Sequence, residues 1–367
     1  MSQNLIGKSL LYVGTYTLKE AKGIYLFLFD ESTGSLQPLG LVAAMPNPTF
    51  LRIHPGGRFL YAVSEVRESG GRQNGSVNAF AVNRATGGLT FINSQLSGGA
   101  GPCHLSVDRT GRVVMAANYA SGSVVALPIK SDGSLGEATE IIQHHGASVN
   151  PERQSGPHAH SITPSPDNRF ALAADLGLDR IMIYRMDVAT GRLQPGNPAW
   201  VAVKPGAGPR HLAFHPIHPL VYVINELDNT VITFAWDAAQ GTLRELQTAS
   251  TLPSGFSGAS STAEVQTDRS GRFLYGSNRG HDSIAIFRIN EPAGTLSPLA
   301  HQPCMGNHPR HFTIHSSGNW LLVANQDSDS IIVFRRNPAT GQLVPTSHSA
   351  TVSMPACLLE VCFQGTA

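Results

Sequence analysis

The sequence predicts an all-β fold: a single seven-bladed β-propeller of four-stranded antiparallel blades that covers residues 1–367. Three observations support this prediction. A unit of roughly 50 residues recurs seven times along the chain. Each copy contains two short β-rich runs, and the second alternates between apolar and polar or aromatic residues. Each copy then has a turn with a glycine two residues before a leucine.

The strands and turns of each unit can be assigned in order. The first β-rich runs occupy residues 10–16, 59–65, 113–119, 170–176, 220–226, 273–279 and 320–326. The second runs, with period two, occupy residues 23–30, 76–83, 123–130, 180–187, 230–237, 283–290 and 330–336. Glycine suits a turn position with positive φ, where a side chain would clash. The turn glycines are Gly34, Gly87, Gly133, Gly191, Gly241, Gly294 and Gly341.

Two further strands complete each predicted blade. A third follows the turn glycine, and a fourth lies just ahead of the first run, as in FLRIHP, HLSVD, HLAFHP and HFTIH. The first unit has no preceding strand of this kind. The apolar tail at residues 356–363 is therefore expected to close the ring by pairing with a strand from the other end of the chain, which would remove an exposed edge. Neither GH…WD marks nor kelch-type glycine pairs recur, so those two propeller families fit poorly.

Composition argues against several classes of function. Lys and Arg number 26 against 25 Asp and Glu, so no basic excess predicts nucleic-acid binding. No apolar stretch is long enough to cross a bilayer, and residues 1–17 lack the pattern of a signal peptide. Cys103, Cys304, Cys357 and Cys362 show no CxxC spacing. We expect a reduced, cytoplasmic protein, a monomer or weak homo-oligomer, without metal or cofactor and without a nucleic-acid or membrane partner.

The repeat also maps one face of the predicted propeller. The loop entering each innermost strand and the loop leaving the next strand lie on the same face. Most residues there are Asn, Asp or His that recur from blade to blade and are expected to cap turns. Four residues break the pattern and come from three consecutive blades: His160, Arg210, Glu226 and Arg279. We expect these four to converge at one sector of the channel mouth, where they suit a base with anion clamps.

Other residues at the same two levels are expected to contact the substrate. They are His104, Tyr119, Asp175, Arg310 and Gln326. The longest repeat interval contains a loop rich in glycine, serine and histidine at residues 144–160, on the same face, where it could act as a lid. Its histidines lack the regular spacing of a zinc motif, so no metal site is predicted.

Four segments resemble the propeller lactonase family, which includes bacterial 6-phosphogluconolactonase and the fungal 3-carboxy-cis,cis-muconate lactonizing enzyme. They are GPHAHSITPSPDNR at 156–169, GAGPRHLAFHP at 206–216, VINELDNTV at 223–231 and GRFLYGSNRG at 271–280. The resemblance extends over nearly the whole chain, and GPRH followed by NEL is its most specific part. It implies that His160, Arg210, Glu226 and Arg279 form the active site and that no metal is needed. The loop at 144–160 is expected to be longer than in compact bacterial members.

The resemblance implies a hydrolase that opens a sugar lactone, 6-phosphogluconolactone or a related aldonolactone, in the pentose phosphate pathway. Glu226 or His160 would activate water, and Arg210 or Arg279 would stabilise the oxyanion. The other arginine, with Arg310, would bind the phosphate or carboxylate of the substrate. The sequence leaves the base undecided, and an ion pair between Glu226 and Arg279 would lower the basicity of the glutamate.

Two alternatives stay open at this level. One is a muconate-type lactonizing cycloisomerase that acts on a dicarboxylate. The other is a non-catalytic propeller that binds a ligand or partner through the same face. A covalent acyl-enzyme is disfavoured, because the sequence has no Gx-Ser-xG elbow between a strand and a helix and no cysteine with an assigned partner.

Overall fold

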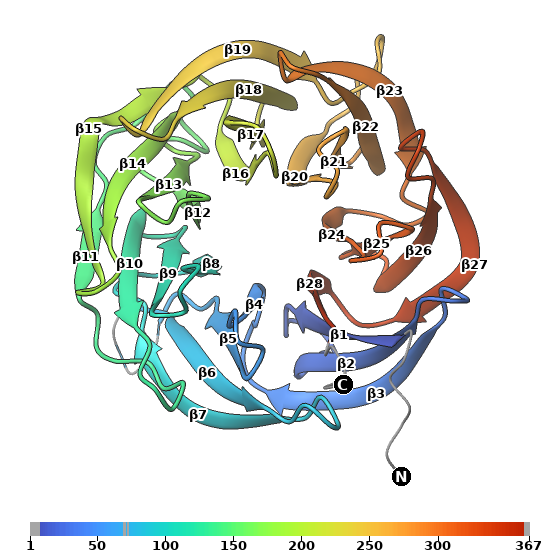
Figure 1. Ribbon diagram of the computed structural model, residues 1–367, viewed down its shortest axis with the longest axis horizontal. Helices are drawn as coiled ribbons and strands as arrows, with labels where there is room; N and C mark the ends of the chain where they lie inside the picture. The colour runs from blue at the N-terminus through green and yellow to red at the C-terminus, as the bar shows by residue number, and fades with distance from the viewer. Residues whose placement is uncertain (1–7, 69–70, 72, 363–367) are drawn as a thin grey trace.

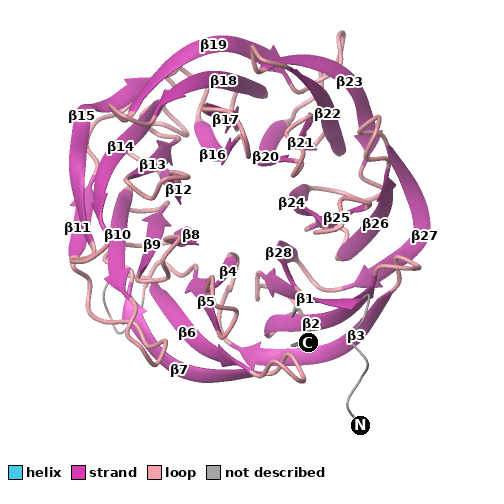
Figure 2. Ribbon diagram, in the orientation of Figure 1, coloured by secondary structure: helices cyan, strands magenta, loops and turns pink. Residues whose placement is uncertain are grey.

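The computed structural model describes residues 8–68, 71 and 73–362, and within these ranges the regular elements are all β-strands. The 28 strands form seven four-stranded antiparallel sheets arranged in a ring (Figures 1 and 2). The predicted seven-bladed propeller is therefore confirmed. No helix in the described ranges is long and apolar enough to span a membrane.

The two inner strands of each blade surround the axis of the ring (Figure 1). The innermost strands are β4 (Leu51–Ile53), β8 (Pro102–Val107), β12 (Ala159–Pro164), β16 (Pro209–Phe214), β20 (Ser261–Thr267), β24 (Pro309–Ile314) and β28 (Pro355–Val361). The second strands are β1 (Lys8–Thr15), β5 (Phe59–Ser64), β9 (Val113–Asn118), β13 (Phe170–Asp175), β17 (Leu220–Asn225), β21 (Phe273–Arg279) and β25 (Trp320–Asn325). The second strands are buried at nearly every position because neighbouring blades cover both of their faces.

The two outer strands of each blade form the periphery. The third strands are β2 (Gly23–Asp30), β6 (Ser76–Val82), β10 (Ser123–Pro128), β14 (Arg180–Asp187), β18 (Thr230–Asp237), β22 (Ser283–Asn290) and β26 (Ser330–Arg336). The outermost strands are β3 (Leu36–Ala44), β7 (Leu89–Leu96), β11 (Glu140–Gln143), β15 (Arg192–Ala202), β19 (Thr242–Ser250), β23 (Thr295–Pro303) and β27 (Leu343–Thr351). Burial alternates along these outermost strands, since one of their faces meets solvent.

The ring closes by pairing the two ends of the chain. Strand β28 is antiparallel to β1, with Leu10 opposite Val361 and Val13 opposite Leu358, and it becomes the innermost strand of the first blade. The predicted closure by the apolar tail is confirmed for the described residues, and Phe363 lies outside them. Strand β28 thus covers the inner edge of β1 in the first blade.

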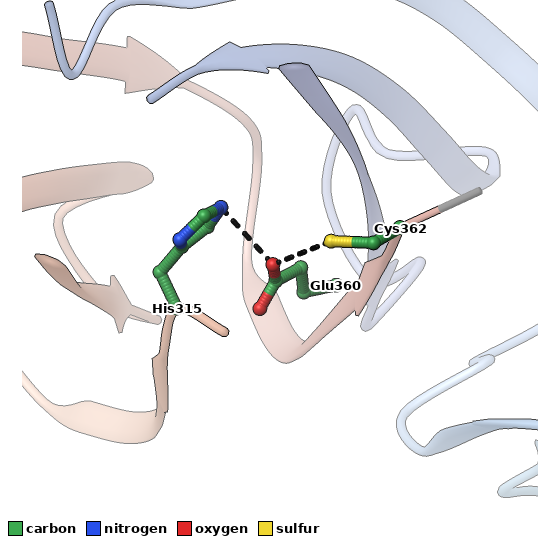
Figure 3. A group of neighbouring side chains, drawn as sticks. All are labelled: His315, Glu360 and Cys362. Atoms are coloured by element: carbon green, nitrogen blue, oxygen red, sulfur yellow. Dashed lines mark hydrogen bonds and ion pairs between the residues drawn. The ribbon is translucent and has the colours of Figure 1, made fainter. Parts of the chain in front are cut away.

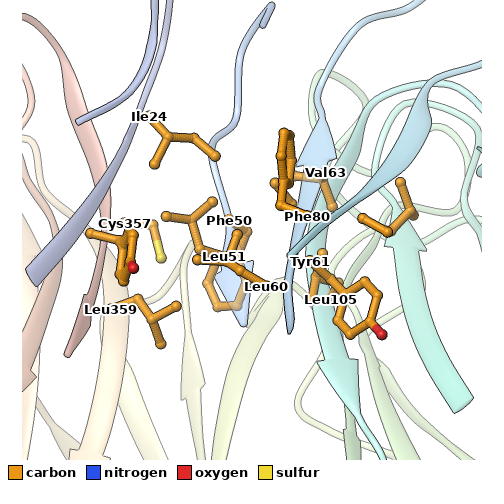
Figure 4. Close-up of a cluster of buried hydrophobic side chains, with 14 of the residues drawn as sticks. Ile24, Phe50, Leu51, Leu60, Tyr61, Val63, Phe80, Leu105, Cys357 and Leu359 are labelled. Atoms are coloured by element: carbon orange, nitrogen blue, oxygen red, sulfur yellow. The ribbon is translucent and has the colours of Figure 1, made fainter. Parts of the chain in front are cut away.

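The apolar core lies between the blades rather than in one central cluster. Figure 4 shows a cluster shared by the first three blades, in which Leu51, Leu60 and Leu105 are fully buried and Leu359 comes from the closing strand. Each buried leucine contributes about 2 kcal/mol of transfer free energy. The same contacts hold neighbouring blades at a fixed angle, and this fixes the positions of the side chains at the ring centre.

In four blades, a tyrosine on the second strand donates a hydrogen bond to a turn of the next blade. The bonds run from the hydroxyl of Tyr12 to the carbonyl of Gly87, Tyr61 to Gly133, Tyr222 to Gly294 and Tyr275 to Gly341, at 2.7–3.1 Å. All seven predicted turn glycines have positive φ, between 68° and 84°. At Gly133 a Cβ atom would also lie 2.3 Å from the Phe59 ring. The recurrent glycine thus permits both the turn and the close approach of the neighbouring blade.

Candidate active site

A register shift at the start of four innermost strands determines which side chains face the centre. In β8, β12, β16 and β24 the pairing with the second strand skips one residue. The skipped residues are Cys103, His160, Arg210 and Arg310. A bulge leaves one residue unpaired and turns its side chain away from the regular pleat. Cys103, Arg210 and Arg310 line a hollow between the innermost strands, which we call the central hollow.

Glu226 lies at the centre of the predicted site, directly after β17. Its Oε2 atom is 3.0 Å from Arg210 Nε and 3.0 Å from Arg279 Nη2. Its Oε1 atom is 2.6 Å from Arg153 Nη2. Burial by itself raises the pKa of the Glu226 carboxyl, but the charges of Arg279 and Arg210 lower the pKa more, so it falls well below its usual range. Glu226 is therefore ionised at neutral pH and is a weak base.

His160 lies beside this carboxylate in a different charge state. Its side chain is buried, and its Nε2 atom is 4.0 Å from Glu226 Oε2. Burial, and then the positive charge of Arg210, lower the pKa of the imidazole well below 6.5. Both groups are therefore unprotonated at neutral pH, and each is a weaker base than the free side chain. The choice between His160 and Glu226 as base, which the sequence left open, stays a prediction.

The four predicted residues therefore lie together, and their catalytic role stays a prediction. Arg279 comes from the end of β21, and its Nη2 also donates to the carbonyl of Thr262 at 2.6 Å. Its buried Nε has no hydrogen-bond partner among the described residues. The Glu226–Arg279 ion pair that the sequence suggested is present.

Arg153 is a site residue that the sequence analysis missed. It lies in the loop between β11 and β12, and its Nη2 donates to Tyr119 Oη at 3.1 Å as well as to Glu226. The Arg153 side chain is 40% exposed, whereas that of Glu226 is 6% exposed. The loop has no counterpart in the other repeats, so the repeat comparison could not single this arginine out.

The loop that carries Arg153 is held by hydrogen bonds to the fourth blade. His144 Nδ1 is 2.6 Å from Asp175 Oδ2, and the other Asp175 oxygen accepts the backbone N–H of His158. Gln154 Nε2 donates to the carbonyl of Leu176 at 2.9 Å. Asp175 therefore holds the loop, and its predicted substrate contact gains no support from this geometry.

Arg310 reaches the central hollow from the seventh blade. Its guanidinium lies over the Tyr16 ring, 5.0 Å from the centroid, and its Nη2 is 4.0 Å from Glu65 Oε2. Glu65 is fixed by hydrogen bonds from Tyr16 Oη at 3.0 Å and Thr49 Oγ1 at 2.5 Å. Arg310 and Arg210 line the same hollow, as predicted from their equivalent positions in the repeat.

The charges around the hollow favour an anionic ligand. Four guanidiniums meet three carboxylates here, and the neighbouring histidines are neutral. The carboxylates are Glu65, Glu226 and Glu264. With Arg52, whose charge also acts on His211, the guanidiniums outnumber the carboxylates further, and this positive excess suits a phosphate or carboxylate, which guanidinium groups bind in a bidentate manner.

Tyr119 borders the four-residue group from the third blade. Its ring stacks on His158, with centroids 4.5 Å apart, and lies edge-on to His160 at 5.3 Å. Its hydroxyl already bonds to Arg153. This position agrees with the predicted substrate contact, which stays a prediction.

A sequence profile of the family described as Lactonase, 7-bladed beta-propeller, matches residues 10–360. The chain belongs to this lactonase family. It is 37% identical over 301 residues to 6-phosphogluconolactonase of Bacillus subtilis, which covers 82% of this chain and 83% of that protein. A putative 6-phosphogluconolactonase of Bacteroides fragilis superposes with a TM-score of 0.91 at 36% identity, over 98% of this chain and 99% of that one. The periplasmic gluconolactonase of Pseudomonas aeruginosa superposes with a TM-score of 0.91 at 36% identity, over 97% of this chain and 99% of that one.

The predicted family and the predicted enzyme class, a lactonase, are confirmed at the level of the family. The expectation that the loop at 144–160 is longer than in compact bacterial members stays a prediction. One relative is named as periplasmic, and the cytoplasmic location of this lactonase stays a prediction.

Two other predicted contact residues of the lactonase, His104 and Gln326, make no hydrogen bond or ion pair with Glu226 within the described residues. His104 Nδ1 accepts the backbone N–H of Ile162 at 3.3 Å, and its ring packs on Phe50 at 4.2 Å. Gln326 follows β25, and its Nε2 donates to Asp327 Oδ1 at 3.0 Å. His104 thus joins two blades and Gln326 bonds to its neighbour, so neither geometry supports the predicted substrate contact.

The thiol of Cys103 has a neighbour that sequence reasoning did not assign. Its Sγ atom is 3.7 Å from His160 Nδ1 and donates to the His160 carbonyl at 3.3 Å. Burial, followed by the charge of Glu65, raises the pKa of the Cys103 thiol, so the thiol is protonated at neutral pH. A covalent mechanism through this thiol is disfavoured, because the thiolate is the nucleophilic form.

Within the described part of the lactonase, one group brings three metal-ligand types together: His315, Glu360 and Cys362 (Figure 3). His315 Nε2 lies 3.0 Å from Glu360 Oε1, and Cys362 Sγ donates to the same oxygen at 3.1 Å. The Glu360 carboxylate can only accept, so the hydrogen of the neutral ring lies on Nε2. Nδ1 accepts the backbone N–H of Ser317 at 3.2 Å and lies 2.8 Å from the Ser317 hydroxyl. The three groups are thus already joined by hydrogen bonds.

The same contact recurs in other blades. In His54 and His215 the Nδ1 atom accepts a backbone N–H two residues along the chain. Their Nε2 atoms bond to the carbonyls of Gly111 and Gly271 in the next blade, at 3.0 and 2.9 Å. In the last blade Glu360 of the closing strand replaces that carbonyl. His315 and Glu360 thus form a closing latch between the two ends of the ring.

Proposed function

We propose that this lactonase hydrolyses an anionic sugar lactone, 6-phosphogluconolactone first, by direct attack of water and without a metal ion. The proposal depends above all on a buried carboxylate, Glu226, that three guanidiniums hold beside the neutral imidazole of His160. Relatives from Bacillus subtilis and Bacteroides fragilis that are named 6-phosphogluconolactonase support the same substrate.

In this mechanism His160 acts as general base. Its neutral imidazole takes a proton from water while the water oxygen attacks the lactone carbonyl. When the tetrahedral intermediate collapses, the ring C–O bond breaks and the imidazolium returns the proton to the departing oxygen. The product is one hydroxy acid. A proton is released only when the carboxyl group of this acid ionises. A positioned base of this kind accelerates a reaction by about 10²–10⁴.

The guanidiniums supply the electrophilic side of the reaction. Arg210 or Arg279 donates N–H groups to the carbonyl oxygen as it becomes negative, a contribution of about 10²–10³ in kcat. Glu226 keeps both arginines in place and stabilises the imidazolium that forms 4.0 Å away. Arg310, in the same central hollow, binds the phosphate of the substrate.

The experiment is hydrolysis of freshly prepared 6-phosphogluconolactone, coupled to 6-phosphogluconate dehydrogenase, with a chelator present. Wild type is expected to exceed the spontaneous rate, and His160→Gln is expected to lose about 10²–10³ in kcat. His215→Gln is the matched control, since His215 is a buried histidine at the opposite end of a neighbouring blade. Loss of the wild-type rate in chelator would contradict metal independence, and an unchanged His160→Gln rate would contradict the assigned base.

A second candidate substrate is a gluconolactone without phosphate, favoured by the name of the Pseudomonas aeruginosa relative. The two lactones are separated by comparing their kcat/KM values in wild type and Arg310→Gln. If Arg310 binds phosphate, the variant loses rate only on the phosphorylated lactone. If neither lactone is hydrolysed above the spontaneous rate, the proposal fails, and carboxymuconates and binding partners become the next assays.

A further inference from the structure

We propose that Glu264 and His211 are positioning residues that orient Arg210 toward the substrate, an inference that rests on the proposed function. Neither residue contacts Glu226 or His160 by a hydrogen bond in the described part of the chain. They lie instead behind Arg210, at the next position of the innermost strands β16 and β20. Both side chains are buried.

The hydrogen bonds fix the tautomer of His211. Its Nδ1 lies 2.8 Å from Glu264 Oε2, and a carboxylate can only accept, so Nδ1 carries the hydrogen. Burial, and then the charge of Arg210, lower the pKa of His211 well below 6.5, so the ring is neutral. Its Nε2 therefore has a free lone pair, and this accepts from Arg210 Nη1 at 3.3 Å.

His211 is an exception among the histidines at its level of the propeller. His104 and His311 occupy the same position in other blades, and each Nδ1 accepts a backbone N–H from the next innermost strand, at 3.3 Å. Their neutral rings thus carry the hydrogen on Nε2, the opposite tautomer. Only His211, which faces Glu264 in the next blade, carries its hydrogen on Nδ1. His211 belongs to the same innermost strand as Arg210. The exception thus coincides with the proposed site.

Hydrogen bonds on two sides fix the plane of the Arg210 guanidinium. Arg210 Nε bonds to Glu226 at 3.0 Å, and Nη1 bonds to the carbonyl of Ala263 at 2.7 Å as well as to His211. Within the described residues Nη2 has no hydrogen bond and is left for a ligand. A neutral histidine between Glu264 and Arg210 fixes the orientation of the guanidinium without adding a second ion pair to the one that Arg210 makes with Glu226.

Glu264→Gln tests the inference through kinetics. The variant is expected to lower kcat by about 10–100-fold with a smaller change in KM, as for other groups that orient a catalytic side chain. Glu360→Gln is the matched control, because it removes the charge from another carboxylate–histidine pair, in the closing latch, whose carboxylate also lies on an innermost strand. Its kcat is expected to equal that of wild type. An unchanged kcat in Glu264→Gln would overturn the inference.

A double-mutant cycle separates positioning from general loss of structure. Lysine at position 210 keeps the charge but not the planar fork that His211 orients. Glu264→Gln is therefore expected to have little further effect in an Arg210→Lys background. An equal fold-loss in both backgrounds would overturn the inference. If Glu264→Gln does not fold, His211→Gln replaces it, since its amide oxygen can still accept from Arg210 and should retain more activity than His211→Leu.

Anion binding keeps the inference distinct from the proposed lactone chemistry. Inorganic phosphate is titrated by calorimetry into wild type, Glu264→Gln and Arg210→Lys. Weaker phosphate binding in Glu264→Gln than in wild type supports positioning even if no lactone is hydrolysed. The same holds if adding Glu264→Gln to Arg210→Lys causes no further loss of phosphate affinity. Equal phosphate affinity in wild type and Glu264→Gln overturns it, whatever the lactone assays give.

Discussion

At the scale of single residues, the site depends on which of two electrostatic effects dominates. Burial favours the neutral form of both Glu226 and His160. For His160 burial dominates and the ring is neutral, because the nearest charges include arginines that also oppose protonation. For Glu226 the arginine charges dominate and the carboxyl is ionised. The same guanidiniums therefore keep a neutral imidazole and a fixed anion side by side.

Arg153→Ala tests the contribution of the loop to this site. Glu226 keeps Arg210 and Arg279, so it stays ionised, and the main loss is a charge that can bind the substrate anion. We expect KM to rise about 10-fold with kcat within about threefold of wild type. Because the side chain is 40% exposed, the free energy of unfolding should change by less than about 0.5 kcal/mol. A large fall in kcat at constant KM would show instead that Arg153 acts on the transition state.

The extent of sequence-based prediction differs between these residues for a physical reason. His160, Arg210, Glu226 and Arg279 could be found because each departs from a repeat whose other members are visible in the sequence. Arg153 could not, because its loop has no repeated counterpart. The orientation of His211 could not be predicted either, because it depends on a hydrogen bond between two blades.

At the scale of elements, the relative positions of the blades are fixed in part by hydrogen bonds that recur between neighbouring blades. Strand alternation and turn glycines were predictable because they are local. The Tyr–Gly bonds and the histidine contacts between blades were not predicted, since they join residues 56–75 positions apart. The bulges that turn Arg210 and Arg310 toward the centre also depend on pairing with the second strand.

A pair of glycine substitutions tests the turn contact between blades. Gly133 and Gly57 both have positive φ, 84° and 67°, so alanine strains the backbone at either position. At Gly133 the new Cβ would also meet the Phe59 ring, whereas nothing lies within 4 Å at Gly57. We expect Gly57→Ala to lower the free energy of unfolding by about 1 kcal/mol and Gly133→Ala by about 3 kcal/mol. Urea denaturation measures both, and equal losses would mean that the contact with Phe59 is not significant.

At the scale of the whole molecule, the ring places charged and neutral groups at its axis, away from water. The innermost strands bring a set of buried histidines to that axis, each with a pKa lowered mainly by burial: His104, His160, His211 and His311. In the unfolded chain these histidines titrate near pH 6.5. The folded state can therefore be protonated at its centre only at a cost in stability.

This arrangement predicts that the lactonase is sensitive to acid. Between pH 6.5 and the lower pKa of the folded state, about 4 for His311, the unfolded chain binds more protons than the folded one. The free energy of unfolding therefore falls as the pH falls, by up to about 1.4 kcal/mol per pH unit for each such histidine. Glu226 adds to the loss only below about pH 4.5, where the unfolded carboxyl is protonated.

Urea denaturation at pH 7.5, 6.5 and 5.5, at constant ionic strength, measures this slope. His311→Gln removes one titrating group and should flatten the slope by about one proton, whatever its effect on stability at pH 7.5. Stability that stays constant or rises between pH 6.5 and 5.5 would contradict neutral histidines at the axis. It would also weaken the case for His160 as the base, because both depend on burial of imidazole beside arginine.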